Sequence, residues 1–180
     1  MIAELGHVAI ILAFIVTILQ STLPMLGAYR NDMRLMLLGE RAALMQFALI
    51  AFAFTALISI FVHSDFSVKL AAVHSHSQTP FIYKITGVWA NHEGSILLWV
   101  LILSIYGALV PILGRSLPLS LKARALAVQG LMGAGFLGFI LFTSNPFERL
   151  AILPVDGQGL NPLLQDPCLL YTSPSPRDRG

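Results

Sequence analysis

The sequence predicts an all-α polytopic membrane protein with four transmembrane helices. Of its 180 residues, 56% are hydrophobic and only 11% are charged, which is outside the usual composition of soluble globular domains. Four stretches contain no Asp, Glu, Lys or Arg: residues 5–29, 42–62, 94–114 and 125–143. Each is close to the roughly 20 residues that a helix needs to cross a bilayer. The net charge is only +2 and the basic residues are scattered over short loops, so no nucleic-acid partner is predicted.

The first span, residues 5–29, starts close to the amino terminus. Residues 1–5 carry no Lys or Arg, so they lack the basic region of a cleaved signal peptide, and we expect this helix to remain as an anchor. Pro24 predicts a bend or a stop near the end of the span, because proline lacks the N–H that a helix interior uses. His7 is predicted to lie at the membrane interface.

The second span, residues 42–62, follows a charged segment at residues 30–41 that we expect to be a short loop. Gln46 is the one strongly polar side chain of this span. Amides inside a bundle commonly hydrogen-bond across helices, so Gln46 predicts a packing role more than a transport role.

Residues 63–86 are polar and mixed, and we expect an extramembrane loop with one short strand, because β-forming residues flank Pro80. On a strand, His74 and His76 would point the same way, as two metal ligands do. No third His, Cys or nearby carboxylate completes the set, so no metal site is predicted. Cys168 is the only cysteine, which excludes an intrachain disulfide.

The third span begins at a cluster of polar and aromatic side chains. Asn91 is predicted to be the N-cap of this helix, with Glu93 in the first turn, where a carboxylate is favoured by the positive end of the helix. Trp89 precedes the cap at the level expected of an interfacial anchor. Capping and anchoring alone would account for these three residues.

On the same helix, His92, Ser95, Trp99 and Tyr106 fall on one face, at spacings of three, four and seven. Two interpretations of this face remain open. It belongs to ordinary interfacial packing, or it flanks a planar ligand or a partner helix.

The fourth span, residues 125–143, is rich in glycine. Gly130, Ala134 and Gly138 repeat every four residues, which makes a small-xxx-small face that admits another helix closely. We therefore expect this face to contact a neighbouring helix and not lipid.

Several motifs carry a resemblance to a known family. Residues 83–99 read YKITGVWANHEGSILLW, and this stretch resembles the CcmF-type subunits of the cytochrome c haem lyase, a cytochrome c assembly family. Further matches, in the family's order, are MIAELGH at 1–7, SDFSV at 64–68, FTSNPF at 142–147 and NPLLQDP at 161–167.

The resemblance covers nearly all of residues 1–167. It implies that they form part of a cytochrome c assembly membrane domain, and that the four helices are a fragment of a larger helical bundle. Residues 168–180 have no counterpart in the family's pattern, so we interpret them as a foreign tail.

The resemblance also implies a function: a subunit of the complex that delivers haem to apocytochrome c and attaches it covalently outside the cytoplasmic membrane. It implies a b-type haem whose ligands lie beyond the matched residues, and it implies partners. These partners are the haem chaperone and the thiol-handling subunits of the maturation system, apocytochrome c, and membrane lipid. We expect the chain alone to be inactive, and no catalytic residue is assigned.

Five residues of the third-helix motif are the candidates for cofactor binding by this resemblance: Trp89, Asn91, His92, Glu93 and Trp99. The alternative function is a membrane transporter or a proton-translocating subunit. Such proteins place ionisable residues in mid-membrane, and the four uncharged spans contain no Asp, Glu, Lys or Arg.

The resemblance implies a bacterial inner (cytoplasmic) membrane, and the basic residues predict the orientation of the chain in it. The two short connections, residues 30–41 and 115–124, carry three basic residues each, whereas the longer loop between them carries Lys69 and Lys84. By the positive-inside rule both short connections are cytoplasmic, so the amino terminus of this multi-pass chain is expected outside.

Overall fold

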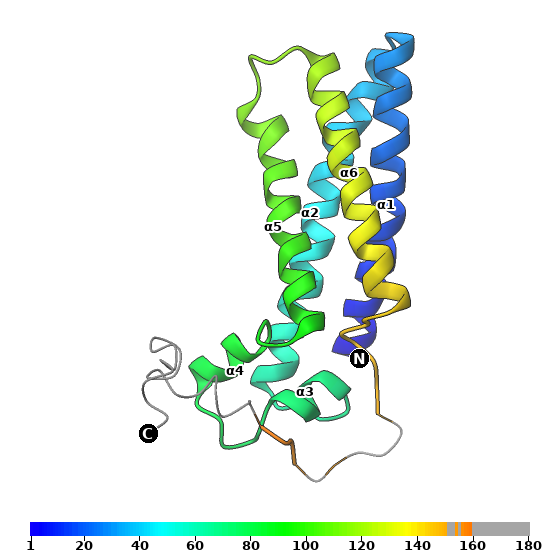
Figure 1. Cartoon of the computed structure of the whole chain (residues 1–180). Coiled ribbons are helices and arrows are strands. Elements are labelled where there is room, and N and C mark those ends of the chain that lie inside the picture. The colour runs from blue at the N-terminus through cyan, green and yellow to red at the C-terminus, as the bar shows by residue number, and fades with distance from the viewer. Residues whose placement is uncertain (151–153, 155, 160–180) are drawn as a thin grey trace, which may run out of the picture.

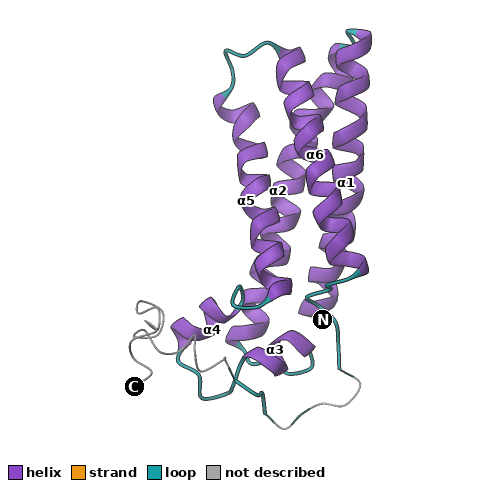
Figure 2. Cartoon of the chain, in the orientation of Figure 1, coloured by secondary structure: helices purple, strands orange, loops and turns teal. Residues whose placement is uncertain are grey.

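The computed structural model describes residues 1–150, 154 and 156–159. The regular structure within these residues is helical (Figure 2). The six helices are α1 (Ile2–Arg30), α2 (Met33–Val62), α3 (Lys69–His74), α4 (Phe81–Gly87), α5 (His92–Leu113) and α6 (Leu119–Phe142). The interpretation of residues 168–180 as foreign concerns residues outside the described part of the chain.

Four long helices run side by side, and α2 packs against the other three (Figure 1). Each of α1, α2, α5 and α6 is long and apolar enough to cross a membrane. The prediction of an all-α protein with four membrane-spanning helices is therefore confirmed. The amino terminus, α3 and α4 lie at one end of the bundle, here called the motif end, and the α1–α2 and α5–α6 turns lie at the other (Figure 1).

The predicted loop at residues 30–41 is wrong, because α2 already begins at Met33. The turn consists of Asn31, with a left-handed φ of 55°, and Asp32, whose carboxylate accepts a hydrogen bond from the Arg34 backbone N–H at 2.9 Å. The charges at the start of α2 therefore sit on a helix that continues past the apolar span. Of the bend or stop predicted near Pro24, the stop is wrong, because α1 continues through Pro24 to Arg30.

The predicted strand in residues 63–86 is wrong as well, because α3 and α4 occupy this segment. Pro80 stands at the N-cap position of α4, where its missing N–H costs nothing, and the β-forming residues after it enter the helix. Among the residues that the structure describes, sheet-like pairing is limited to one isolated antiparallel bridge between Val68 and Arg149.

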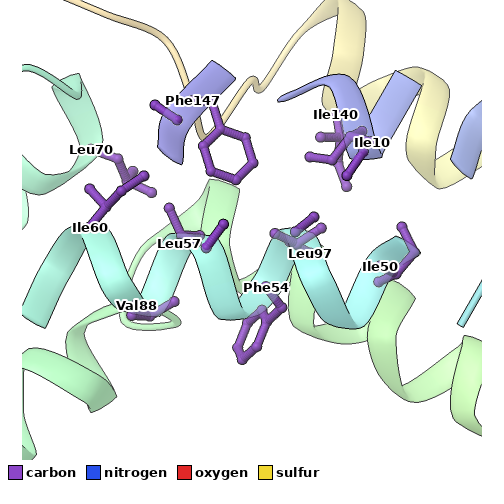
Figure 3. Close-up of a cluster of buried hydrophobic side chains, with 14 of the residues drawn as sticks. Ile10, Ile50, Phe54, Leu57, Ile60, Leu70, Val88, Leu97, Ile140 and Phe147 are labelled. Atoms are coloured by element: carbon purple, nitrogen blue, oxygen red, sulfur yellow. The ribbon is translucent and has the colours of Figure 1, made fainter. Parts of the chain in front are cut away.

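The main core gathers buried side chains from all four long helices and from the motif end (Figure 3). Its labelled members are Ile10, Ile50, Phe54, Leu57, Ile60, Leu70, Val88, Leu97, Ile140 and Phe147. Leu70, Val88 and Phe147 come from α3 and from connecting segments, so the core extends beyond the four helices. The motif end is thereby tied to the bundle by apolar contact.

At the motif end, ion pairs connect the segment after α6 to α1 and α3. Arg149 pairs with Glu4 at 2.6 Å, and Glu148 pairs with Lys69 at 3.0 Å. The backbone N–H of Lys69 also donates to the Glu148 carbonyl at 2.9 Å. The segment after α6 thus bridges α1 and α3.

The glycines of α6 admit α1 and α2 closely. A Cβ at Gly130 would lie 3.0 Å from the Ser21 backbone nitrogen of α1, and one at Gly133 would lie 2.8 Å from Nε2 of Gln46 in α2. A Cβ at Gly138 would make an ordinary 3.5 Å contact with Phe14 of α1. The predicted helix contact is confirmed at Gly130 and Gly138, but the repeat missed Gly133.

Three glutamines meet between these helices and form what we call the glutamine node. Gln20 Nε2 of α1 donates to Gln129 Oε1 of α6 at 2.5 Å and to the Leu126 carbonyl at 3.1 Å. Gln129 Nε2 lies 3.2 Å from the Leu103 carbonyl of α5 and 3.5 Å from Gln46 Oε1 of α2. The bridging role predicted for Gln46 is therefore confirmed, through a long hydrogen bond.

Candidate functional site

The motif at the start of α5 is built around the N-cap predicted for it. Asn91 Oδ1 accepts the Gly94 N–H at 2.7 Å, while its Nδ2 donates to the carbonyls of Gly87 and Val88 at 3.0 and 3.1 Å. A Cβ at Gly94 would overlap the Val88 carbonyl oxygen, so the turn requires glycine there. The side-chain bonds of Asn91 thus all serve the backbone, and its role in the site is to hold the turn from α4 to α5.

An open pocket of about 430 Å³ lies beside this turn, and we call it the motif pocket. Its lining residues are Trp89, Ala90, Asn91, His92, Ser95, Ile96, Trp99 and Phe136. It therefore brings together Trp89, Asn91, His92 and Trp99, four of the five candidates. Glu93 does not line it, because successive residues of a helix point about 100° apart.

Phe136 of α6 is the pocket residue that lies outside the motif, and the sequence did not predict it. Phe136 reaches the pocket because of the register of α6 against α5. This register cannot be read from the periodicity of either helix. A second open hollow, of about 480 Å³, shares Ile96 and Phe136 with the motif pocket and adds Met132, Gly135 and Phe139. An apolar groove therefore continues along α5 and α6 from the motif pocket.

The predicted polar and aromatic face of α5 is exposed in this chain. Trp99 and Tyr106 are each 66% exposed, and His92 is exposed as well. The His92 ring meets Phe139 edge to face, with centroids 6.0 Å apart. Tyr106 lies outside the motif pocket, so this face divides into a pocket part near His92 and a plain part further along the helix.

The other histidines do not line the motif pocket, and three of them have hydrogen-bond partners elsewhere. His7 lies 3.2 Å from Asn145, and the Nδ1 atoms of His63 and His74 lie 2.8 and 3.2 Å from the backbone carbonyls of Ser59 and Leu70. No group of three potential metal ligands forms among the described residues. His74 ends α3 and His76 lies in the following turn, so the strand that would have aligned them does not exist.

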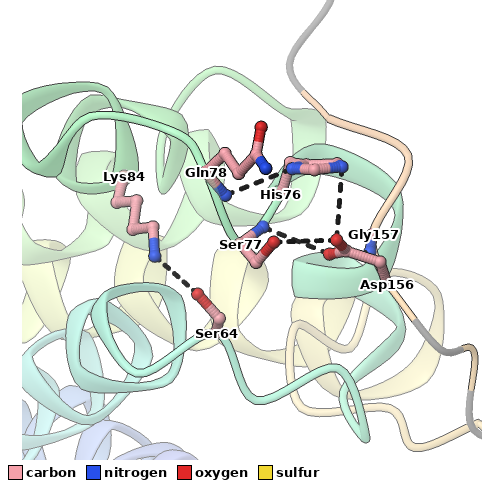
Figure 4. Close-up of polar contacts among 7 residues, drawn as sticks. All are labelled: Ser64, His76, Ser77, Gln78, Lys84, Asp156 and Gly157. Carbon is pink, nitrogen blue, oxygen red and sulfur yellow. Dashed lines mark hydrogen bonds and ion pairs between the residues drawn. The ribbon is translucent and has the colours of Figure 1, made fainter.

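His76 belongs to a polar cluster at the motif end (Figure 4). Its Nε2 lies 3.3 Å from Asp156, which also accepts bonds from the Ser77 hydroxyl at 2.8 Å and from the backbone N–H groups of Ser77 and Gly157. The Ser77 bond, helped by those N–H groups and by His76, holds the pKa of Asp156 below its usual value, although desolvation acts in the opposite direction.

The cluster contains a Ser, a His and an Asp, but it lacks the order of a hydrolytic triad. The Ser77 hydroxyl donates a hydrogen bond to Asp156, whereas a nucleophilic serine would be hydrogen-bonded to the histidine. Backbone hydrogen bonds also hold the segment around Gly157: the Gln158 N–H donates to the Ala72 carbonyl at 2.8 Å and the Gly159 N–H to the Ser75 carbonyl at 3.2 Å.

Comparison with known proteins gives the family. The family described as "Cytochrome C assembly protein" matches residues 89–171, which begins at Trp89 of the motif. Cytochrome c-type biogenesis protein ccl1 of Rhodobacter capsulatus is 53% identical over 97% of this chain. The chain belongs to the CcmF-type cytochrome c biogenesis family. CcmF of Escherichia coli is 43% identical over 97% of this chain.

A solved structure of the CcmF family has the same fold. Cytochrome c Heme Lyase CcmF superposes with a TM-score of 0.75 and 26% identity, and the match covers 82% of this chain and 25% of that one. The chain spans 27% of the length of the R. capsulatus and E. coli relatives. The four helices therefore correspond to one part of these longer relatives.

Proposed function

We propose that this chain is part of a haem lyase subunit that delivers haem and attaches it covalently to apocytochrome c outside the cytoplasmic membrane. The observation that carries the proposal is the motif pocket, which gathers two tryptophans, His92 and Phe136 at one end of the membrane bundle. The name of the solved relative, a cytochrome c haem lyase, supports the same assignment.

The residues of the motif pocket fit one side of a planar aromatic group. Trp89, Trp99 and Phe136 would pack against the ring system, and the exposed imidazole of His92 would meet its polar edge. Asn91 and Glu93 would act indirectly, through the start of α5. When bound, haem supplies the iron centre and the vinyl groups that react with cytochrome thiols.

The proposal assigns the iron ligands of a b-type haem to residues beyond the matched part of the chain. His92 is the single histidine that lines the motif pocket within the described residues, and an axial pair needs two facing groups. The haem chaperone, the thiol-handling subunits and apocytochrome c are proposed partners, and the motif end is their proposed contact region.

We place this chain in the bacterial inner membrane, with the motif end and the amino terminus outside. The α1–α2 and α5–α6 connections meet at the opposite end of the bundle, and residues around them carry Arg30, Arg34, Arg41, Arg115, Lys122 and Arg124. The positive-inside rule makes that end cytoplasmic. The three amides of the glutamine node do not titrate, so no observation favours the proton-translocating alternative.

A chimera tests the proposed function. Residues 1–167 would replace the matching part of the E. coli relative in cells that lack their own copy, and holocytochrome c would be measured by haem staining. We expect Trp99→Ala and His92→Ala to lower the yield roughly fivefold or more, since both remove pocket contacts.

Tyr106→Ala is the matched control, because Tyr106 has the same helix, face and exposed fraction as Trp99 but lies outside the motif pocket. Its yield should stay within about twofold of the unmodified chimera, as expected for an exposed side chain without a defined site. Equal yields from all three variants would contradict a functional role of the pocket and would leave a structural scaffold.

A further inference from the structure

Another open pocket, of about 400 Å³, lies between α2 and α5 at the end of the bundle opposite the motif pocket. We call it the basic groove. Arg41 of α2 and Arg115, just after α5, line it, together with Glu40 and the apolar side chains of Leu37, Leu44 and Ile112. Its walls therefore combine two guanidinium groups with aliphatic surface from two helices.

The acidic residue of the basic groove already has a cationic partner. Glu40 pairs with Lys122 of α6, and the two side chains are only 19% and 11% exposed. The five ion pairs formed among the described residues involve neither Arg41 nor Arg115. The groove therefore presents the charge of two arginines without a carboxylate to neutralise it.

Arg41 also borders another hollow, on the adjacent face of α2. This hollow lies between α1 and α2, has a volume of about 280 Å³, and is otherwise apolar, with Leu19, Leu38 and Met45 among its walls. The Arg41 guanidinium thus stands between the basic groove and an apolar hollow. The same side chain can contact a charged group at the groove mouth while aliphatic chains occupy the two adjacent faces of the helix.

The position of the two arginines along the bundle is that of a lipid headgroup. Arg41 directly precedes the uncharged span 42–62, and Arg115 directly follows the uncharged span 94–114. These spans are about the length of the hydrocarbon core, so both arginines lie where it ends. Leu37 and Leu44 are 39% and 40% exposed beside them and offer surface for acyl chains.

We propose that Arg41 and Arg115 bind the phosphate of an anionic diacyl phospholipid. Its acyl chains lie in the basic groove and in the hollow between α1 and α2. Guanidinium groups bind phosphate through paired charge-assisted hydrogen bonds, and basic pockets between membrane helices suit such headgroups. In the orientation given above, the lipid belongs to the cytoplasmic leaflet. The site is independent of the proposed haem function.

Native mass spectrometry of the purified chain in detergent tests this site. The protein would be titrated separately with dioleoyl phosphatidylglycerol and dioleoyl phosphatidylcholine, and we expect tighter binding of the anionic lipid. The double variant Arg41→Gln/Arg115→Gln should weaken phosphatidylglycerol binding roughly 30-fold, because each basic residue near an anionic headgroup contributes about fivefold or more.

The matched control is Arg34→Gln/Arg124→Gln. It removes the same charge from the same end of the bundle, at two exposed arginines that do not line the groove. We expect binding within about threefold of the unmodified chain, as for screened charges outside a site. An equal loss in both double variants, or no loss in either, would overturn the proposal.

Two further arms keep the test decisive. Equal affinity of the unmodified chain for the two lipids would overturn the proposal even if the groove variant failed to fold, which circular dichroism would report. Glycerol 3-phosphate would be added at the concentration of the bound lipid, and we expect it to leave the lipid bound. Displacement by it would assign the arginines to a free phosphate ligand instead.

Discussion

The interface of α6 with α1 and α2 and the outward face of α5 differ in how tightly their side chains are held. At the interface, Gly130 lies so close to α1 that an added Cβ would be 3.0 Å from a backbone nitrogen, and the glutamine node joins the helices. On α5, Trp99 and Tyr106 are each 66% exposed, and the motif pocket opens beside them.

This difference separates residues that shape the bundle from residues that are free to bind. Helices in lipid gain little from hydrophobicity itself, so close backbone contact and interhelical hydrogen bonds supply the specific stability at the α6 interface. The exposed aromatic side chains of α5 are not part of these stabilising contacts. Changes at the interface should therefore affect folding, and changes on α5 should affect binding.

The largest expected effect on folding is that of Gly130→Leu. A leucine there would meet the backbone of Ser21 and force α1 away from α6, which should destabilise the bundle by about 3 kcal/mol. Unfolding of the purified protein in mixed micelles of increasing denaturing detergent would measure the loss.

Gly135→Leu is the control for this change, because nothing lies within 4 Å of a Cβ at Gly135 on the same helix. It should alter stability by no more than about 0.5 kcal/mol. A similar loss in both variants would break the distinction between the packed interface and the open groove.

A smaller effect is expected at the glutamine node. Gln129→Leu would leave the buried amides of Gln20 and Gln46 without their shared partner, and should cost about 1 kcal/mol in the same unfolding measurement. Replacing all three glutamines by leucine should restore part of the loss, since no orphaned amide remains. A triple variant less stable than the single one would show instead that the hydrogen bonds themselves stabilise the bundle.

The smallest expected effect lies at the exposed motif end, where Asp156 holds the segment around Gly157. The pKa of Asp156 is lowered in the folded chain, so its contribution to stability is present above the unfolded pKa and is lost as pH falls through the folded pKa. Ser77→Ala removes the largest cause of the lowering, so that loss should occur at higher pH. The carboxyl carbon chemical shift would follow the titration, and an unchanged midpoint would refute the Ser77 contribution.

Features that depend on local spacing were predictable from the sequence. The four spans, the Asn91 cap and the shared face of His92 and Trp99 each follow from residues within one helix. Charge was misleading at residues 30–41, because a helix can continue beyond the bilayer, where its arginines are exposed. The β-forming residues after Pro80 were misleading for a different reason, since proline at the N-cap position starts a helix there.

Features that depend on the register between helices were not predictable. Phe136 enters the motif pocket and Gln129 meets Gln20 because antiparallel helices align at particular heights, and no periodicity within one helix encodes that alignment. The same limit applies to the basic groove, where Arg41 and Arg115 are far apart in sequence.

The measurement that tests the account most directly is a haem titration of the purified chain, followed by its Soret band, with His92→Ala in parallel. In the proposed function, the motif pocket contacts one side of the haem, and the iron ligands lie beyond the matched part of the chain. We therefore predict no stoichiometric low-spin haem in either protein. Stoichiometric low-spin haem that depends on His92 would contradict the account and would place an axial ligand within these four helices.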